Sequence, residues 1–340
     1  MAGGISGIKA LVTGGGGFLG GAIVRKLLER GNTVRSFSRG KYPDLEKMGV
    51  EQIRGDLGNP DAVAKACTDI DVVFHVAAKA GVWGDYKQYY NVNFIGTKNV
   101  IKACLSKGIA SLIYTSSPSV VFDGTDMEGV DETTPYPEHY HAFYPETKAM
   151  AEKIVVKAAK KGLKTVSLRP HLIWGPGDTN FAPRILARAK KLRIVGDGRN
   201  RVDTLYIDNA ADAHLLAADR LRESDKISGR VYFISQDEPM NLWEMINAIL
   251  DAGGLPPVTR SISQNTARRI GALLEFIYRT FRLPGEPKMT KFLAAELGTS
   301  HWFDISAAKT DLGYKPEVST KEGLKRLSGW LENRISIRSA

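Results

Sequence analysis

The first half of the sequence alternates short β-prone runs with stretches of helical periodicity, and this alternation constrains the fold more than any other feature. Six such runs fall at residues 8–13, 33–38, 51–56, 71–76, 111–116 and 165–169. Strands alternating with helices imply βαβ units, right-handed crossovers and a parallel sheet covered on both faces. We therefore expect an α/β fold with a doubly wound sheet over residues 1–170. Beyond it, residues 171–340 are expected to form mainly a smaller, mostly helical domain, with some segments returning to the first.

A glycine-rich turn follows the first expected strand. It reads Gly14-x-x-Gly17-x-x-Gly20 and leads into a helical pattern that ends near Gly31. Such a turn lets the backbone approach a pyrophosphate, whose charge is stabilised at the helix N-terminus; a merely tight turn is the alternative. We thus expect a Rossmann domain. The expected cofactor contacts in the turn are Gly14, Gly16, Gly17, Phe18, Leu19 and Gly20.

The end of the second expected strand indicates which dinucleotide is bound. Sites that prefer NAD usually place Asp or Glu here, but this chain has Ser38 and Arg39. Arg39 is suited to a charge-assisted bond with a 2′-phosphate, helped by the Ser38 hydroxyl. The sequence therefore predicts NADP(H) over NAD(H), with a solvated Arg39 as the alternative. Asp56 and Leu57, after the third strand, are expected beside the adenine, although Asp56 is equally suited to capping a turn.

Tyr144 and Lys148 are candidate catalytic residues. Their spacing places a phenol and an ammonium on one helix face, although such pairs also occur by chance on solvated helices. Beside a nicotinamide, the positive charges of the Lys148 ammonium and of the nicotinamide favour phenolate. They bring the pKa of Tyr144 towards the range that is useful for acid-base catalysis. Ser117, after the fifth strand, is positioned to orient the reacting oxygen. Asn93 is suited to holding a proton-relaying water, or else to bonding backbone as an ordinary helix amide.

These motifs resemble those of the extended short-chain dehydrogenases/reductases, in the 3β-hydroxysteroid dehydrogenase branch. The matching segments are the glycine turn, Asp56-Leu57, His75–Ala78, Asn93–Thr97, Tyr114–Ser117, Tyr144-x-x-x-Lys148, Arg169-Pro170 and Tyr206–Ala210. The resemblance implies that Tyr144 exchanges the proton, Lys148 modulates its pKa and binds the cofactor ribose, and Ser117 binds the carbonyl oxygen. It also implies further cofactor contacts from Ala77, Ala78 and Pro170.

Within that branch the chain is most similar to bacterial 2-alkyl-3-oxoalkanoate reductases of olefin biosynthesis. The segments that carry this similarity are 77–84, 172–178, 195–198 and 287–293. It implies interconversion of a 3-keto and a 3-hydroxy group on a bulky apolar acid. Sterol-4-carboxylate 3-dehydrogenases, which decarboxylate, share this chemical core and are the alternative, as is a 3β-hydroxysteroid dehydrogenase. A sugar-nucleotide epimerase or a non-catalytic NADP-binding scaffold are further alternatives.

A carboxylate on the substrate requires a cation or strong donors. Lys79 and His171 are the first candidates, with Arg184 and Arg201 behind them. Solvation of Lys79 and a strand-capping role for His171 are the alternatives. The aromatic residues expected to line an apolar pocket, or else to be structural, are Trp83, Tyr140, Trp174 and Tyr206.

Composition narrows the class of partner and the compartment. The chain has a net charge of +10, but its Lys and Arg residues are spread along its length without a nucleic-acid-binding motif. The charge favours anionic small ligands or an anionic membrane surface, and we expect no nucleic acid. Two cysteines, Cys67 and Cys104, argue for a reducing compartment and against a metal cluster. Without a signal-peptide pattern or a long apolar run, we expect a cytoplasmic protein, at most peripheral to membranes.

Residues 266–282 form a basic amphipathic pattern. Its apolar positions are Ile270, Leu273, Leu274, Ile277, Tyr278 and Phe281, and its arginines lie near the ends. An internal packing face is the common interpretation of such a stripe, whereas contact with a membrane or a pathway enzyme is the alternative. A homodimer is implied by the family resemblance.

Overall fold

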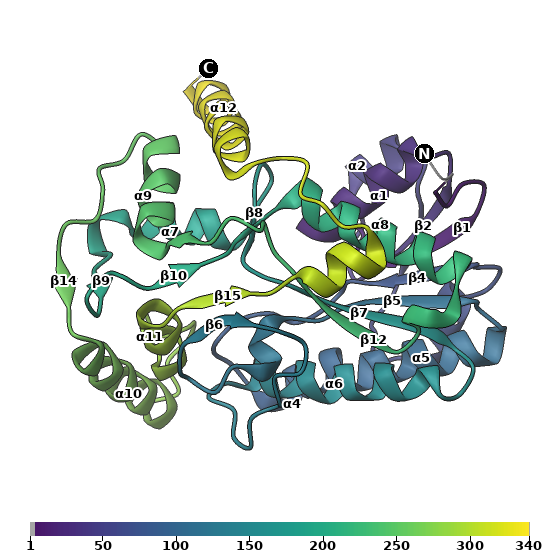
Figure 1. The fold of residues 1–340 in the computed structure, drawn as a ribbon, viewed down its shortest axis with the longest axis horizontal. Coiled ribbons are helices and arrows are strands. Elements are labelled where there is room, and N and C mark those ends of the chain that lie inside the picture. The colour runs from purple at the N-terminus through teal and green to yellow at the C-terminus, as the bar shows by residue number, and fades with distance from the viewer. Residues whose placement is uncertain (1–3, 340) are drawn as a thin grey trace.

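The computed structural model describes residues 4–339 and is built around a seven-stranded parallel sheet (Figure 1). The strand order is β12-β7-β5-β4-β1-β2-β3. The strands are β1 (Lys9–Thr13), β2 (Thr33–Ser38), β3 (Glu51–Arg54), β4 (Val72–His75), β5 (Ser111–Thr115), β7 (Lys164–Pro170) and β12 (Arg230–Ile234). Six of these seven match the runs expected from the sequence, and the doubly wound α/β fold is confirmed.

Helices cover both faces of this sheet. On one face α1 (Phe18–Glu29) packs against α8 (Ile207–Glu223). On the other face α5 (Gly96–Lys107) packs against both α3 (Pro60–Ala66) and α6 (Phe143–Ala159). Shorter helical segments in the connections are α2 (Pro43–Lys47), α4 (Tyr86–Tyr89) and a π-helical stretch (Tyr90–Ile95) that runs into α5.

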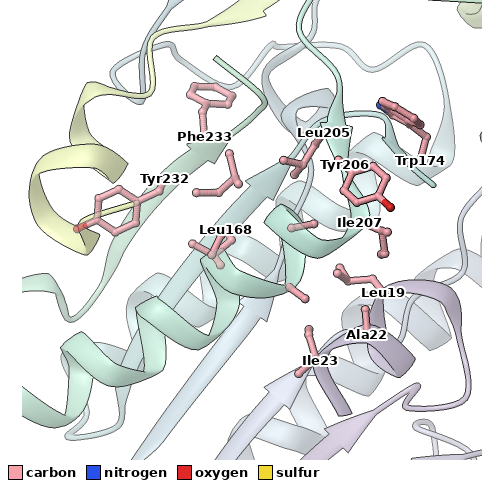
Figure 2. Close-up of a cluster of buried hydrophobic side chains, with 14 of the residues drawn as sticks. Leu19, Ala22, Ile23, Leu168, Trp174, Leu205, Tyr206, Ile207, Tyr232 and Phe233 are labelled. Carbon is pink, nitrogen blue, oxygen red and sulfur yellow. The ribbon is translucent and has the colours of Figure 1, made fainter. Parts of the chain in front are cut away.

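The sheet divides its side chains between two apolar cores. Val12 of β1 packs in the core that contains α1, whereas its neighbour Leu11 packs in the core on the side of α3 and α5. This alternation follows from the two-residue period of a strand. Figure 2 shows part of the first core, where Leu19, Ala22 and Ile23 of α1 point towards the strands and α8. Both faces of the sheet are therefore buried, as is usual for a parallel sheet.

The chain beyond β7 lies mostly over one end of the large sheet (Figure 1). Its helices, apart from α8, are α7 (Phe181–Arg188), α9 (Leu242–Ala252), α10 (Gln264–Thr280), α11 (Lys291–Gly298) and α12 (Thr320–Ser339). Short strands form a sheet of order β13-β10-β15-β6, in which β6 comes from the chain before β7, and the pairs β11-β8 and β14-β9. They are β6 (Met127–Val130), β8 (Ile173–Trp174), β9 (Ile194–Val195), β10 (Arg201–Val202), β11 (Leu205–Tyr206), β13 (Met240–Asn241), β14 (Ser261–Ile262) and β15 (His301–Phe303). Strands this short carry no recognisable periodicity, which is why the sequence predicts mainly helices here.

One segment of the second half completes the large sheet. β12 pairs with β7 in parallel, from Arg230 opposite Val166 to Ile234 opposite Pro170. α8 also packs on β5 and β7. The division into domains at residue 170 stays a prediction, and its outer limits, residues 1–3 and 340, lie outside the described residues.

Candidate active site

The glycine turn between β1 and α1 is shaped to receive a diphosphate. Gly14 has φ +73°, and its carbonyl accepts the Gly17 N–H at 2.8 Å. A Cβ on Gly20 would lie 2.1 Å from the Gly14 carbonyl oxygen, so only glycine allows α1 to start this close to the turn. The first turn of α1 carries no acidic residue, and its N-terminal N–H groups remain available to an anion. These residues fit the pyrophosphate of a dinucleotide.

Tyr42 forms a wall of this turn that the sequence did not suggest. A Cβ on Gly16 would lie 2.3 Å from the Tyr42 ring. The Gln52 side chain holds the Tyr42 backbone through two hydrogen bonds, of 2.9 and 3.0 Å. No motif marks an aromatic residue four positions beyond the end of β2, so this contact emerges only from the fold.

The ends of β2 and β3 carry two arginines. Arg39 is exposed, and no described residue pairs with its guanidinium. The Arg54 Nε donates a hydrogen bond to the Arg39 carbonyl at 3.4 Å, which brings a second exposed cation to the same edge. The Ser38 hydroxyl lies at the end of the same strand β2. Like Tyr42, Arg54 was not expected from the sequence, because no local pattern relates it to the end of β2.

The other expected cofactor contacts are placed as follows. The Asp56 carboxylate accepts a hydrogen bond from the Gly58 N–H at 2.7 Å, as expected if Asp56 caps a turn. Contact between Asp56 and the adenine stays a prediction. Leu57 is buried in the core on the side of α3 and α5. Ala77 lies against the glycine turn, since a Cβ on Gly14 would be 3.1 Å from its Cα, and Ala78 follows it in an exposed position.

Tyr144 and Lys148 occupy successive turns at the start of α6, beside the end of β5. The Lys148 Nζ donates to the Thr115 carbonyl at 2.5 Å and lies 4.2 Å from the centre of the Tyr114 ring. Burial lowers the pKa of Lys148 to about 7, although the Glu152 carboxylate acts in the opposite direction. A buried amine that titrates near neutral pH can both accept and return a proton.

The pKa of the Tyr144 phenol is raised to about 12, chiefly by burial. The Ser117 hydroxyl lowers this pKa and the charge of Glu296 raises it. The phenol is therefore protonated at neutral pH, and the expected lowering by Lys148 is not found in the protein alone because burial dominates. A protonated phenol is suited to giving a proton to a carbonyl oxygen.

Ser117 and Asn93 differ in how they are held. The Ser117 Oγ lies 2.9 Å from the Ser119 Oγ, and Ser117 is partly exposed in a cavity wall. The buried Asn93 amide is engaged: it accepts the Lys79 N–H at 2.7 Å, and it donates to the Lys79 carbonyl at 3.1 Å and to the Thr147 hydroxyl at 3.0 Å. These contacts make Asn93 a bridge between residue 79 and α6, while a relay water remains a prediction.

A cavity of about 400 Å³ opens beside Tyr144 and Ser117. It is bounded by the start of the second half of the chain, α7 and α11. Its apolar lining includes Val82, Pro118, Phe122, Met127, Leu172, Ile173, Phe181, Ile185, Leu192, Val202, Leu242, Ile246, Phe292, Leu293 and Leu297. A cavity of this composition suits an apolar ligand with a small polar centre.

The expected substrate residues divide between the cavity and other places. His171 lines the cavity, as does Pro170. Trp174 is fully buried, donates to the Thr204 hydroxyl at 2.9 Å and packs against Tyr206 in the core (Figure 2), so it is structural.

Lys79 and Trp83 also lie outside the cavity lining. The Lys79 ammonium lies over the Tyr89 ring, 5.1 Å from its centre. Trp83 contacts α10 through Tyr278 and Arg279. A role for either in binding substrate stays a prediction that the cavity does not support.

His171 is a neutral acceptor in this cavity. Its Nδ1 lies 2.7 Å from the Asp203 carbonyl oxygen, which can only accept, so Nδ1 carries the hydrogen. Burial lowers the pKa of His171 to about 4. His171 therefore supplies no positive charge to a substrate carboxylate at neutral pH.

α10 turns its apolar face outward. Ala267, Gly271 and Glu275 form its buried face, and the Glu275 carboxylate accepts the Lys291 N–H at 2.8 Å. The large exposed apolar residues on and after α10 are Ile270, Leu273, Phe276, Phe281 and Leu283, with Leu273 59% and Phe276 64% exposed. The internal-packing interpretation therefore fails for Ile270, Leu273 and Phe281, whereas Leu274, Ile277 and Tyr278 are half-buried. No helix within residues 4–339 is both long and apolar enough to cross a membrane.

The sheet order, the glycine turn and the Tyr144–Lys148 pair define an extended short-chain dehydrogenase/reductase. The chain belongs to the 3-beta hydroxysteroid dehydrogenase/isomerase family, whose model matches residues 11–262. By family and by site it is an oxidoreductase.

Related proteins align with nearly the whole chain. A 2-alkyl-3-oxoalkanoate reductase of Stenotrophomonas maltophilia is 52% identical over 94% of this chain and 98% of its own length. One of Shewanella oneidensis is 50% identical over 95% of this chain and 86% of its own length. The decarboxylating sterol-4-alpha-carboxylate 3-dehydrogenase of Mus musculus is 34% identical over 94% of this chain and 89% of its own length.

Solved structures have a fold similar to that of this chain. The structure of gox2253 has a TM-score of 0.78 and 28% identity, covering 96% of this chain and 98% of that one. The UDP-glucuronic acid 4-epimerase of Bacillus cereus, in complex with UDP-glucuronic acid and NAD, has a TM-score of 0.74 and 25% identity, covering 96% of this chain and 100% of that one.

Proposed function

We propose that the chain is an NADP(H)-dependent reductase of 2-alkyl-3-oxoalkanoates. The observation that carries this proposal is the pair of hydroxyls, Tyr144 and Ser117, in the wall of an apolar cavity of about 400 Å³. Such a substrate has a compact polar centre, a keto group beside a carboxylate, between two alkyl chains. The two reductases that are 50% and 52% identical support the same substrate class.

The chain's own groups manage the proton and the oxygen. Bound NADPH supplies the hydride to the 3-keto carbon. Tyr144, protonated at neutral pH, gives its proton to the substrate oxygen while the Ser117 hydroxyl holds that oxygen. Lys148, with a pKa near 7, lies one turn away and can return a proton to the phenol. In the oxidative direction the same groups act in reverse.

The preference for NADP(H) is supported by charge at the end of β2. Arg39 is free to bind a 2′-phosphate, Ser38 adds a hydroxyl, and Arg54 adds a second cation. No carboxylate follows β2 directly to compete for the ribose hydroxyls. NAD(H), which the Bacillus cereus epimerase binds, is the alternative cofactor.

Oxidation of a 4-carboxysterol or a related 3β-hydroxysteroid is the second candidate. The mouse relative supports it, and a sterol acid presents the same 3-oxygen and nearby carboxylate on an apolar body. The apolar lining of the cavity disfavours a sugar nucleotide. The intact set of Tyr144, Lys148 and Ser117 disfavours a scaffold without turnover.

A substrate panel tests this proposal. The purified chain is offered a racemic 2-alkyl-3-oxoalkanoic acid with NADPH and, separately, a 4-carboxysterol with NADP⁺. We expect turnover of the keto acid alone. Turnover of the sterol alone would contradict the proposal in favour of the second candidate, and turnover of neither would contradict both.

We also propose that α10 contacts an anionic membrane surface. Its exposed apolar residues are flanked by Arg268, Arg269, Arg279 and Arg282, and this combination complements anionic lipid. Trp83, near the cavity-lining residue Val82, packs against α10, so the patch lies close to the site where a long alkyl substrate binds. Contact with a pathway enzyme is the alternative, and a homodimer stays a prediction.

Co-sedimentation with vesicles that contain phosphatidylserine tests the membrane contact. We expect Leu273→Gln to weaken binding, whereas Leu105→Gln, which changes an exposed leucine of α5, leaves it unchanged. Equal binding by both variants and the native chain, or no binding at all, would remove this proposal.

A further inference from the structure

Glu296 is a carboxyl group in the wall of the apolar cavity. It lies in the last turn of α11, next to the cavity-lining residue Leu297 and one turn beyond Phe292 and Leu293. No hydrogen bond or ion pair from a described residue reaches its carboxyl. A carboxyl in apolar surroundings is costly without a partner, and the cavity is the place where a ligand can provide one.

The nearby cations have another partner. Arg184 and Arg188 line the same cavity from α7, and both bond to Glu286, at 3.3 and 3.4 Å. All three side chains are partly exposed. The arginines therefore form an exposed cluster with their own carboxylate and leave Glu296 uncompensated.

The second histidine of the cavity, His301, also lacks a hydrogen to donate into it. The Thr299 hydroxyl donates to the Ala295 carbonyl at 2.9 Å, so its oxygen accepts from the His301 Nε2 at 2.7 Å. Only the bare Nδ1 remains, and burial lowers the pKa of His301 to about 3. Together with His171, this leaves the inner cavity rich in acceptors.

We propose that protonated Glu296 donates a hydrogen bond to the carboxylate of the bound acid, so that the two carboxyl groups share one proton. This inference rests on the proposed function, because it requires an acid as substrate. Glu296 and Tyr144 line the same cavity, and the charge of Glu296 raises the pKa of the Tyr144 phenol. In a 3-oxo acid the carboxyl carbon is two bonds from the carbonyl carbon, so a substrate held by Tyr144 brings its carboxylate towards Glu296.

The proton is available at neutral pH. Burial raises the pKa of Glu296 to about 7, whereas a 3-oxo acid is ionised there. Two ionised carboxylates at short range repel one another, and sharing a proton removes that repulsion. Binding of the acid above pH 7 therefore requires the uptake of one proton, and affinity falls as pH rises through this range.

Calorimetry measures this proton directly. The native chain with NADPH is titrated with a 2-alkyl-3-hydroxyalkanoate, a pair that cannot react, in buffers of different ionisation enthalpy. We expect an uptake of about one proton per site at pH 8 and of about one tenth at pH 6, from the position of the Glu296 pKa. Glu296→Gln, which always has an amide hydrogen to donate, should show none, while Glu286→Gln should retain the uptake.

Kinetics provide the second readout. The KM of the native chain for the keto acid should rise about tenfold per pH unit above 7, because one proton is required. In Glu296→Gln the KM should be independent of pH, and a ketone of equal length without the carboxyl should show no such rise with the native chain.

The outcomes separate this inference from the proposed function. Binding and turnover of the acid without proton uptake, or with equal uptake in Glu296→Gln, would overturn the role of Glu296 alone. A raised KM in Arg184→Ala with no change in Glu296→Gln would assign the carboxylate to Arg184. Failure of the native chain to bind or turn over either acid would remove the proposed function and this inference together.

Discussion

The Glu152 carboxylate and the Arg169 guanidinium form a two-point ion pair inside the protein. The Arg169 Nε donates to Oε2 at 3.0 Å and a terminal nitrogen donates to Oε1 at 2.7 Å, with both side chains at most 3% exposed. The Tyr136 hydroxyl donates to the same carboxylate at 2.7 Å. Because Glu152 lies one turn beyond Lys148 on α6 and Arg169 lies on β7, the pair fixes α6 against the sheet.

Removing one partner of this pair should destabilise the fold severely. Glu152→Ala leaves a buried guanidinium without its counter-charge, and we expect a loss of about 3–5 kcal/mol in the free energy of unfolding. The matched change Glu223→Ala breaks an exposed pair with Arg220 and should cost less than about 1 kcal/mol. Urea unfolding of both variants checks this, and equal losses would contradict the structural role assigned to Glu152.

The glycine turn offers a pair of adjacent substitutions with opposite results. Gly20→Ala places a Cβ 2.1 Å from the Gly14 carbonyl oxygen, so α1 must shift. We expect the affinity for the cofactor to fall by more than tenfold, which corresponds to a loss of about 1.4 kcal/mol or more in binding free energy. In Gly21→Ala the nearest contact is 3.4 Å, and affinity should be kept. Fluorescence titration with NADPH measures both. Unchanged affinity in Gly20→Ala would mean that the turn does not hold the diphosphate.

Arg39 should decide between the two nicotinamide cofactors. Arg39→Asp removes a charged hydrogen bond to the 2′-phosphate, worth about 1.5–3 kcal/mol, so the NADPH to NADH ratio of kcat/KM should fall by about 10- to 100-fold or more. Lys41→Ala changes a neighbouring cation that is paired with Glu46 at 2.9 Å and should leave the ratio alone. A ratio that does not move in Arg39→Asp counts against NADP(H) preference.

Lys148 should make the native protein less stable as pH falls from about 10 to 7. Burial lowers its pKa from 10.5 to about 7, so within this window the unfolded chain binds more protons than the native chain. Stability then rises with pH through the window. Lys148→Met should be inactive yet gain stability relative to the native chain at pH 7, with the gain shrinking towards pH 10.

An exposed lysine of the same helix provides the control. Lys157→Met should show no pH-dependent difference from the native chain in denaturant unfolding. If the difference in unfolding free energy between Lys148→Met and the native chain is the same from pH 7 to 10, burial of the Lys148 ammonium does not destabilise the protein.

The sequence predicts the large sheet well because each strand and helix there carries its own periodicity. β1 and α1 flank a turn whose glycines are required by local geometry, and Tyr144 and Lys148 share a helix face by spacing alone. The return of β12 to the sheet edge depends on tertiary pairing with β7, which no local pattern specifies.

Residues of the substrate cavity were harder to foresee. Arg184 was a candidate from the sequence, but Glu296 and His301 reach the cavity only after folding, and a single Glu on a helix has no distinguishing spacing. Trp174 is the reverse case, a residue expected in the pocket that lies in the core. The sequence near a motif does not distinguish a tryptophan that faces the cavity from one that faces the core. Burial decides such cases, and burial is a property of the packed chain.

The most direct test of the central claim is the rate of NADPH oxidation by the native chain and by Tyr144→Phe on one 2-alkyl-3-oxoalkanoic acid. Phenylalanine keeps the ring and removes the proton donor, so we expect turnover to fall by about 10²- to 10⁴-fold while the Kd for NADPH is unchanged. Full turnover by Tyr144→Phe would contradict the assignment of Tyr144 as the group that protonates the substrate oxygen.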